Sequence, residues 1–313
     1  MSTTACAHPN IALIKYWGKQ AGAGNLPASP SLSITLDDLT TTTRVEEAKE
    51  DRILLNGEST SDSKILGFLH TLRQRYTVPK LRIETKNNFP TAAGLASSAS
   101  GFAALVTAID AHCELGMSDT VRSGFARQAS GSAARSIFGG FVGLCGPDWV
   151  AQPVLGPSEW PLKVVIAVTD EGRKPVSSTE GMRAAEATSP YFPAWVSSTT
   201  DDYQAALALV AARDFVALAE LAEASCLKMH ALMLSTRPPM IYWRPATLAC
   251  IEAVRNLRAE GTRVFFTIDA GPQLKAVCLP EAAGAVERAL SAVSGVLSTR
   301  VVGLGGGARV VPA

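Results

Sequence analysis

Residues 87–101 constrain this chain more than any other stretch, because they are mostly small and join two segments of different kinds. Residues 80–85, just before the stretch, alternate between polar and apolar side chains, which predicts a half-buried strand. Residues 101–110, just after it, are rich in Ala and Leu, which predicts a buried helix. The stretch therefore connects a strand to the start of a helix.

Two interpretations of this junction are open at this point. Small residues let backbone N–H groups approach a ligand closely, and a helix N-terminus favours an anion, so the junction fits a phosphate-binding loop. It lacks the Gly-Lys-Ser/Thr ending of a Walker loop and the spaced glycines of a dinucleotide fingerprint. A capped turn with small residues for packing fits the same pattern.

The length, composition and net charge of the chain exclude several classes of protein. With 313 residues, 47% of them hydrophobic and 18% charged, the chain is long enough for one large domain or two medium lobes with a substantial core. Its 29 basic and 28 acidic residues leave a formal net charge of +1. Neither nucleic acid nor a membrane surface is therefore expected as a partner, and any anion site has to come from a local cluster.

Cysteine usage and the N-terminal sequence indicate a cytoplasmic protein. The cysteines are dispersed without C-x-x-C spacing, and the histidines show no metal-ligand pattern, so we expect free thiols and no protein-built metal site. We see no basic region followed by a long apolar run at the N-terminus. No apolar stretch reaches the length of about 18 residues that a membrane span requires.

Lys15 and Lys19 form the first candidate anion site. They follow the apolar run 11–14, which predicts a short buried strand. A lysine placed in a buried setting needs an anionic partner. The alternative is that both lysines are solvated residues at the end of a strand.

Residues 129–140 form a second small-residue segment, interpreted as a loop. It contains Ser130, Ser132 and Arg135. Arginine is suited to bidentate binding of phosphate or carboxylate. The alternative is a helix cap followed by a surface ion pair.

Two further positions have both a structural and a functional interpretation. Asp269 lies where the apolar strand 262–268 meets a glycine turn, so it is either a turn-forming residue or a carboxylate at the floor of a pocket. Ser177 and Ser178 precede Glu180, as in a helix cap, and the same hydroxyls are suited to a ligand.

The remaining pattern predicts alternating elements. Strands are expected at residues 31–36, 40–45, 51–55, 141–145, 162–169 and 274–279, with a tight turn at 56–58. Helices are expected at 63–76, 122–129 and 246–260, the last ending at Gly261. Residues 182–233 are predicted to be mostly helical, most clearly at 203–223.

These motifs, in their order along the chain, carry a resemblance. They are Asn-Ile-Ala-Leu-Ile-Lys-Tyr-Trp-Gly-Lys at 10–19, the junction at 87–101, Ser-Gly-Ser-Ala-Ala-Arg-Ser at 130–136, Ser-Ser-Thr-Glu-Gly-Met at 177–182 and Thr-Ile-Asp-Ala-Gly-Pro at 267–272. Together they span roughly residues 5 to 280, and the chain resembles the diphosphomevalonate decarboxylases of the GHMP kinase superfamily.

The resemblance implies a two-lobed α+β fold. The N-terminal lobe, 1–180, is expected to be related to ribosomal protein S5 domain 2 and to carry the ATP phosphate loop. The C-terminal lobe, 181–313, is expected to be ferredoxin-like, with the active site in the cleft between the lobes. The implied reaction converts ATP and mevalonate 5-diphosphate into isopentenyl diphosphate, carbon dioxide, phosphate and ADP, and the implied assembly is a homodimer.

The resemblance also assigns roles to matching positions. Asp269, Lys15 and Asn10 match catalytic positions. Substrate-binding positions are matched by Tyr16, Lys19, Ser130, Ser132, Arg135, Ser177 and Ser178. The ATP phosphate loop is matched by Gly94, Ala96, Ser97 and Ser98, with Mg²⁺ shared with the ATP oxygens.

Departures from the family pattern are mild. Ala129, Ala134 and Gln273 stand where relatives often have Gly, Cys and Asn. None removes a charged group, although fine substrate preference is left open. A mevalonate 3-kinase, a phosphomevalonate decarboxylase and an inactive binding protein on the same fold remain alternatives.

Overall fold

The structure is a computed structural model that describes residues 2–22, 24–89, 97–172 and 176–312. One sheet contains the N-terminal strand. Its order is β14 (Arg309–Val311), β1 (Ser2–Ala7), β4 (Thr41–Glu47), β7 (Leu81–Asn87), β5 (Arg52–Leu55) and β6 (Glu58–Thr60). Helix α2 (Ser97–His112) packs on β1 and β4, and it also contacts α3 (Asp119–Ala129). Apolar side chains of α2 and α1 (Ser63–Arg73) form the core here, including the tilted ring pair of Phe68 and Phe102.

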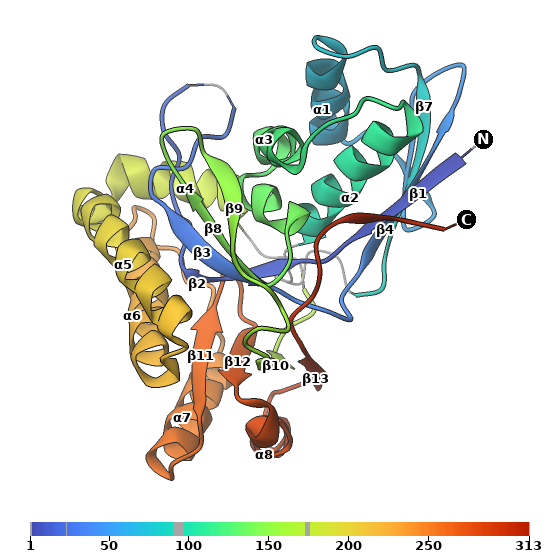
Figure 1. The fold of residues 1–313 in the computed structure, drawn as a ribbon. Coiled ribbons are helices and arrows are strands. Elements are labelled where there is room, and N and C mark those ends of the chain that lie inside the picture. The colour runs from blue at the N-terminus through green and yellow to red at the C-terminus, as the bar shows by residue number, and fades with distance from the viewer. Residues whose placement is uncertain (1, 23, 90–96, 173–175, 313) are drawn as a thin grey trace.

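A second sheet lies in the middle of the molecule (Figure 1). Its order is β2 (Asn10–Ile14), β3 (Ser31–Thr35), β8 (Phe141–Cys145) and β9 (Val150–Leu155). Helices α5 (Phe192–Ala212) and α6 (Phe215–Leu234) pack against β2. Every residue of β2 and β3 is buried, so even their polar side chains face the interior.

The third sheet has the order β11 (Val264–Ile268), β12 (Leu274–Cys278), β10 (Lys163–Val168) and β13 (Ser298–Val302). Helices α7 (Pro245–Ala259) and α8 (Ala283–Ser291) pack on it, and α4 (Ser178–Thr188) contacts α6. A short 3₁₀ turn, η2 (Pro280–Ala282), precedes α8. One apolar core joins this sheet to the middle sheet and to α5 and α6.

Several local predictions are confirmed. Asn56 and Gly57 both adopt positive φ, at 51° and 90°, in the tight turn between β5 and β6. Helix α7 ends before Gly261, whose φ of 94° suits a glycine that terminates a helix. The strand, turn and strand around Asp269 are present as β11 and β12.

The prediction that residues 182–233 are mostly helical is confirmed, with a break where Arg213 adopts a left-handed conformation with φ of 54° and Asp214 caps α6 by accepting from Ala217 N at 3.1 Å. One prediction of local structure is wrong. The small-residue segment after α3 is not a loop but a 3₁₀ helix, η1 (Gly131–Ile137), whose Arg135 is buried. Hydrogen bonds from Arg135 to Ser31, Ser33 and Asn10 tie this segment to the middle sheet.

The proposed division into lobes 1–180 and 181–313 stays a prediction. Strand β10 hydrogen-bonds to β12 and β13, which follow it by more than a hundred residues. Strand β14, close to the C-terminus, pairs with β1. The two ends of the chain therefore lie side by side (Figure 1).

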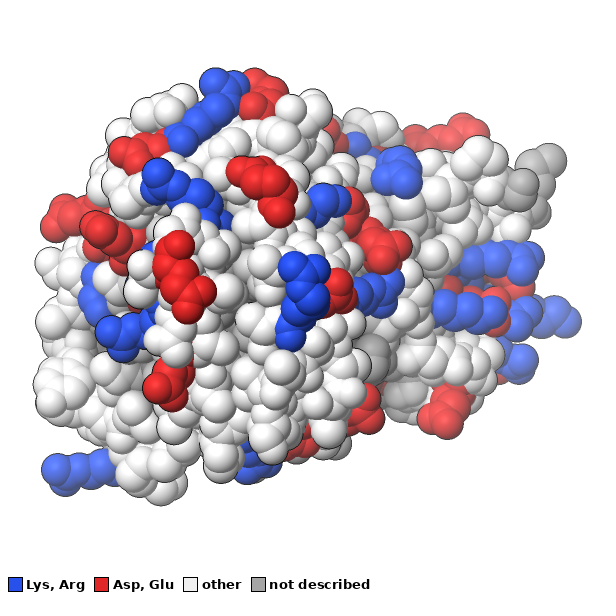
Figure 2. Space-filling view, turned by 90° about the horizontal axis from the view of Figure 1, so that it is seen from below, with Lys and Arg blue, Asp and Glu red and all other residues white. Residues whose placement is uncertain are grey.

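Charges are mixed on the outer surface. Figure 2 shows Lys and Arg interspersed with Asp and Glu on the face seen from below, beside a broad area without charged side chains. In the part of the chain that the structure describes, no helix is both long enough and apolar enough to cross a membrane.

Candidate active site

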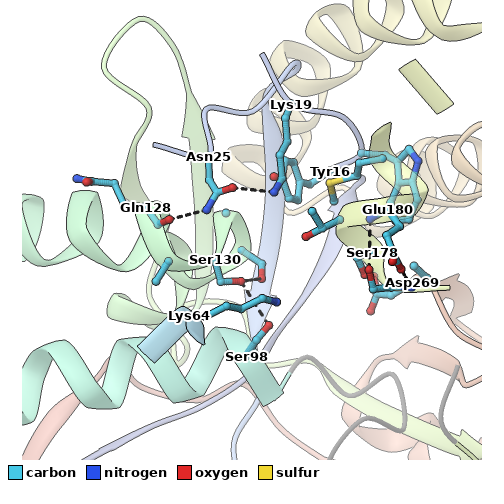
Figure 3. A pocket seen from close by; sticks show the side chains of 18 of the residues that line it. Tyr16, Lys19, Asn25, Lys64, Ser98, Gln128, Ser130, Ser178, Glu180 and Asp269 are labelled. Carbon is cyan, nitrogen blue, oxygen red and sulfur yellow. Dashed lines mark hydrogen bonds between the residues drawn. The ribbon is translucent and has the colours of Figure 1, made fainter. Parts of the chain in front are cut away.

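A cavity of about 1060 Å³ brings together the motifs that are far apart in sequence. Its walls come from the end of β2 and the segment after it, one face of α1, the start of α2, η1 with the end of α3, the start of α4, and the turn after β11 (Figure 3). Each of the five motifs therefore contributes residues to the same cavity.

Asp269 forms the charged floor of this cavity. Lys15 Nζ donates to Asp269 Oδ1 at 2.7 Å, and Lys275 Nζ lies 3.3 Å from Asp269 Oδ2. Both lysine side chains are 1% exposed, whereas that of Asp269 is 26% exposed. The structural interpretation of Asp269 as a simple turn residue is thus too limited, although Gly271 N does bond to its backbone carbonyl at 2.7 Å.

Two opposing effects act on the pKa of Asp269. Burial by itself raises the pKa, because it removes water from the carboxylate. The charges of Lys15 and Lys275, together with the hydrogen bond from Lys15, outweigh burial and hold the pKa well below its ordinary range. Asp269 is therefore an anion at neutral pH.

Arg135 lies deep in the wall, 2% exposed. Its guanidinium donates to Ser31 Oγ at 2.6 Å, to Ser33 Oγ at 3.0 Å and to Asn10 Oδ1 at 3.3 Å. All three acceptors are neutral, and among the described residues Arg135 has no ion pair. Burial accordingly lowers the pKa of Arg135 to about 10, which still leaves it cationic at neutral pH.

Asn10 holds Arg135 and η1 together. While its Oδ1 accepts from Arg135, its Nδ2 donates to Ser136 Oγ at 2.7 Å and to the backbone carbonyl of Ser132 at 3.0 Å. The side chain also reaches the cavity. Asn10 therefore has a positioning role that the sequence did not reveal.

Tyr16 and Gly131 fit closely together. A side-chain carbon at position 131 would overlap the Tyr16 hydroxyl, so glycine is required there. The hydroxyl is buried and has no hydrogen-bond partner among the described residues. Burial raises the pKa of Tyr16 to about 12, which keeps the phenol protonated and able to donate to a ligand.

Lys19 is held at the mouth of the cavity. Its Nζ donates to Asn25 Oδ1 at 2.7 Å, and Asn25 Nδ2 donates to the carbonyl of Gln128 at 2.5 Å (Figure 3). Burial, and then the positive charges of Lys64 and Arg183, lower the pKa of Lys19. These three cations make the mouth attractive to a polyanion.

Serine hydroxyls line the opposite wall. The hydroxyl oxygen of Ser98, at the start of α2, lies 3.3 Å from that of Ser130. The hydroxyl oxygens of Ser130 and Ser132 are 3.5 Å apart. Ser97 also reaches the cavity, so the N-terminus of α2 faces it. The predicted ATP-loop residues Gly94 and Ala96 lie outside the described residues.

The two serines before Glu180 have different surroundings. Ser177 caps α4, since its Oγ accepts from Glu180 N at 3.3 Å and its own N–H donates to Glu180 Oε2 at 3.0 Å. The predicted helix cap is confirmed, and the Ser177 hydroxyl also lines the cavity. Ser178 lines it as well.

Sequence reasoning missed several residues of this site. Lys64 and Arg183 could not be recognised from the sequence, because charged residues on a helix are ordinarily exposed to solvent. Ser31 and Ser33 are predicted only as part of a strand, and in the structure their hydroxyls accept from Arg135. Lys275 had one available signal, a lysine within an otherwise apolar strand.

Comparisons with known proteins agree with this geometry. Residues 7–146 match the model of the diphosphomevalonate decarboxylase-like N-terminal domain, and residues 164–300 match that of the mevalonate 5-diphosphate decarboxylase C-terminal domain. A diphosphomevalonate decarboxylase of Aspergillus fumigatus is 37% identical over 324 residues, covering 93% of this chain and 80% of that protein.

Solved structures share the whole fold. A mevalonate diphosphate decarboxylase from Staphylococcus aureus superposes with a TM-score of 0.92 at 33% identity, covering 99% of this chain and 98% of that one. A structure of MDDEF in complex with MVAPP, AMPPCP and magnesium gives a TM-score of 0.91 at 36% identity, covering 100% and 99%. The two-lobed α+β fold is thereby confirmed, and the chain belongs to the diphosphomevalonate decarboxylase family.

Proposed function

We propose that this chain decarboxylates mevalonate 5-diphosphate in an ATP-dependent reaction, giving isopentenyl diphosphate, carbon dioxide, phosphate and ADP. The observation that carries the proposal is the ionised Asp269, clamped by lysines at the floor of a cavity that also contains the buried Arg135. Family membership supports the same reaction, which belongs to the mevalonate route of isoprenoid biosynthesis.

The chemistry explains why these groups are needed. The 3-hydroxyl of the substrate is a poor leaving group until it carries a phosphoryl group. When phosphate then leaves, positive charge develops on carbon, and the electrons of the bond to the carboxylate form the new double bond as carbon dioxide departs. The protein has to align the reactants and stabilise charge, which is where most catalysis of phosphoryl transfer originates.

Asp269 is the proposed catalytic carboxylate. It accepts a hydrogen bond from the 3-hydroxyl and orients it toward ATP, and Lys15 beside it keeps the carboxylate charged. Asn10 fixes the neighbouring wall. The proposed ligands of the substrate's anionic groups are Tyr16, Lys19, Ser130, Ser132, Arg135, Ser177 and Ser178.

The remaining wall fits ATP and Mg²⁺. The N-terminus of α2, with Ser97 and Ser98, favours a phosphate group, and the cations Lys64 and Arg183 line the same cavity. Gly94 and Ala96 are proposed for the same loop. Among the described residues no group of three or more His, Cys, Asp and Glu side chains could hold a metal ion. The resemblance implies a Mg²⁺ shared with the ATP oxygens, where it would neutralise phosphate charge.

A product assay tests the reaction. The protein is incubated with ATP, Mg²⁺ and either mevalonate, its 5-phosphate or its 5-diphosphate, and both ADP and carbon dioxide are measured. We expect equal amounts of the two products with the diphosphate. ADP without carbon dioxide would indicate a 3-kinase, turnover of the monophosphate alone a phosphomevalonate decarboxylase, and no turnover a binding protein.

The homodimer and the cytoplasmic location belong to the same proposal. The family resemblance supports a dimer, and the free thiols of all six cysteines are compatible with a reducing compartment. Sedimentation velocity tests the assembly. A single monomeric species at micromolar concentration would contradict the dimer.

A further inference from the structure

Strand register places Lys275 next to Asp269. In the pairing of β11 with β12, Thr267 lies opposite Lys275, and Ile268 lies opposite Leu274. Opposed residues point to the same face of a sheet, and Asp269 lies two residues beyond Thr267. The Lys275 ammonium therefore reaches Asp269 Oδ2, at 3.3 Å.

The two lysines approach the carboxylate from different sides. Lys15 follows β2 of the middle sheet, binds Oδ1 at 2.7 Å and lines the cavity. Lys275 comes from the third sheet, is 1% exposed and does not belong to the cavity wall that the described residues form. Lys275 thus lies behind Asp269 as seen from the cavity.

Few other titratable groups of the described residues act on Lys275. Besides Lys15 and Asp269, the titratable groups facing it are Cys226 and His230 on α6. His230 is neutral, because burial, and then the charge of Lys15, lowers its pKa to about 3. Burial likewise lowers the pKa of Lys275, an effect that Asp269 opposes. Among the described residues, Asp269 supplies the favourable carboxylate charge for Lys275.

We propose that Lys275 is a positioning residue for the reaction: from behind Asp269 it fixes the rotation of the carboxylate and keeps it ionised, which leaves Lys15 to face the substrate. This inference rests on the proposed function. A carboxylate held by two cations is a weak base, so it orients the 3-hydroxyl first. The hydroxyl proton passes to Asp269 only as the new oxygen–phosphorus bond forms and the bond from the γ-phosphorus to the ADP oxygen breaks.

The test is the pH profile of the Lys275→Met variant of the full chain, since methionine keeps the length and removes the charge. We expect kcat at neutral pH to fall about 10-fold and the acid limb of the kcat profile to move up by about 1 pH unit or more, the usual effect of losing a nearby opposite charge. KM for ATP and for mevalonate 5-diphosphate should stay within about 3-fold, because Lys275 touches neither.

Lys163→Met is the matched control. Lys163 begins β10 in the same sheet, opposite Cys278, and is only partly buried. The same chemical change there should leave kcat and its pH profile unaltered. A folded Lys275→Met protein with the wild-type acid limb would overturn the inference and reduce Lys275 to a structural role.

Double variants decide the matter if the single variant is poorly folded. If Lys275 acts through Asp269, then adding Lys275→Met to Asp269→Asn should lower the residual kcat less than about 2-fold, because coupled residues are not additive. Independent, additive losses of rate would refute the inference.

Failure of the inference and failure of the proposed function give different results. The wild-type product assay reports the function by itself. If the wild type releases no carbon dioxide, the acid dependence of thermal unfolding still tests the contact. Asp269→Asn should then change this dependence less in the Lys275→Met background than in the wild type. Equal changes in both backgrounds would count against Lys275.

Discussion

At Asp269, charge compensation decides the protonation state. An isolated buried carboxylate costs several kcal/mol and takes up a proton instead. Here two ammonium groups lie at 2.7 and 3.3 Å, and their attraction exceeds the cost of burial. A permanently ionised side chain next to a cavity is a strong candidate for a functional group.

Replacing Asp269 by Asn should lower kcat by at least about 100-fold, the usual scale for a positioned acid–base group. KM for mevalonate 5-diphosphate should change little, because its anionic groups are held elsewhere. Steady-state kinetics measure both quantities. Asp38→Asn, at an exposed turn with an ion pair to Arg300, is the control that should retain full activity. Near-normal turnover of Asp269→Asn would remove Asp269 from the mechanism.

Arg135 donates its hydrogen bonds to uncharged groups, so its positive charge remains available to an anionic ligand. Lysine at this position keeps the charge but loses the planar fork that bonds to Ser31, Ser33 and Asn10. We expect Arg135→Lys to lose about 10- to 100-fold in kcat/KM, equivalent to one or two charge-assisted hydrogen bonds.

The control for this prediction is Arg82→Lys, an exposed arginine on β7 paired with Glu46. It should keep the wild-type kcat/KM. If Arg135→Lys matches it, then Arg135 does not grip the substrate through its fork.

At the scale of elements, Asp51, just before β5, connects this strand to the end of α1 and to the start of β7. It accepts from both terminal nitrogens of Arg73 at the end of α1, at 2.7 and 2.8 Å, and from Leu81 N at the start of β7, at 3.0 Å. Lys80 adds a contact at 3.1 Å. The hydrogen bonds from Arg73 contribute most to holding the pKa of Asp51 well below its ordinary range.

This low pKa gives a pH-dependent prediction. A carboxyl whose pKa is lowered by folding contributes stability that is complete above its unfolded pKa of about 4 and is lost as the pH falls toward its folded pKa. Asp51→Asn should therefore lower the free energy of unfolding by about 2 kcal/mol at pH 7, and by less at pH 3. Urea unfolding at the two pH values measures the difference.

Glu50→Gln is the neighbouring control, since its ion pair with Arg52 is 68% exposed on both sides. Its effect should stay within about 0.5 kcal/mol at either pH. A destabilisation by Asp51→Asn that is the same at both pH values would show that the charge of Asp51 is not what stabilises the junction.

At the scale of the whole molecule, the cavity exists only because the three sheets meet. Thr267 Oγ1 on β11 donates to the carbonyl of Ala12 on β2 at 3.1 Å, and Lys15 N donates to Ser225 Oγ on α6 at 3.0 Å. These contacts join the middle sheet to the third sheet and to α6 beside the Lys15–Asp269 pair. A ligand in the cavity therefore contacts segments that unfolding would separate.

Ligand binding should consequently stabilise the fold. At a concentration 100 times Kd, a ligand that binds only the folded state adds about 2.7 kcal/mol, which raises Tm by several degrees. We expect mevalonate 5-diphosphate to raise Tm more than mevalonate does, because the cationic mouth and Arg135 recognise the diphosphate. Differential scanning calorimetry of the wild type and of Arg135→Lys measures this. Equal shifts for the two ligands would exclude recognition of the diphosphate.

The sequence by itself determined the features whose causes lie within a few residues. The Asn56-Gly57 turn, the end of α7 before Gly261 and the cap of α4 by Ser177 follow from local backbone preference and local hydrogen bonds. The ordered motifs also indicated the family and most of the residues that line the cavity.

Only the tertiary structure decided what depends on distant partners. The 3₁₀ helix around Arg135 and the inward orientation of Ser31 and Ser33 arise from packing between elements. Lys275 meets Asp269 because of the register between two strands, which no local pattern specifies. Local propensity acts through neighbouring residues, whereas the charge balance of a buried site depends on which side chains the assembled sheets bring within a few ångströms.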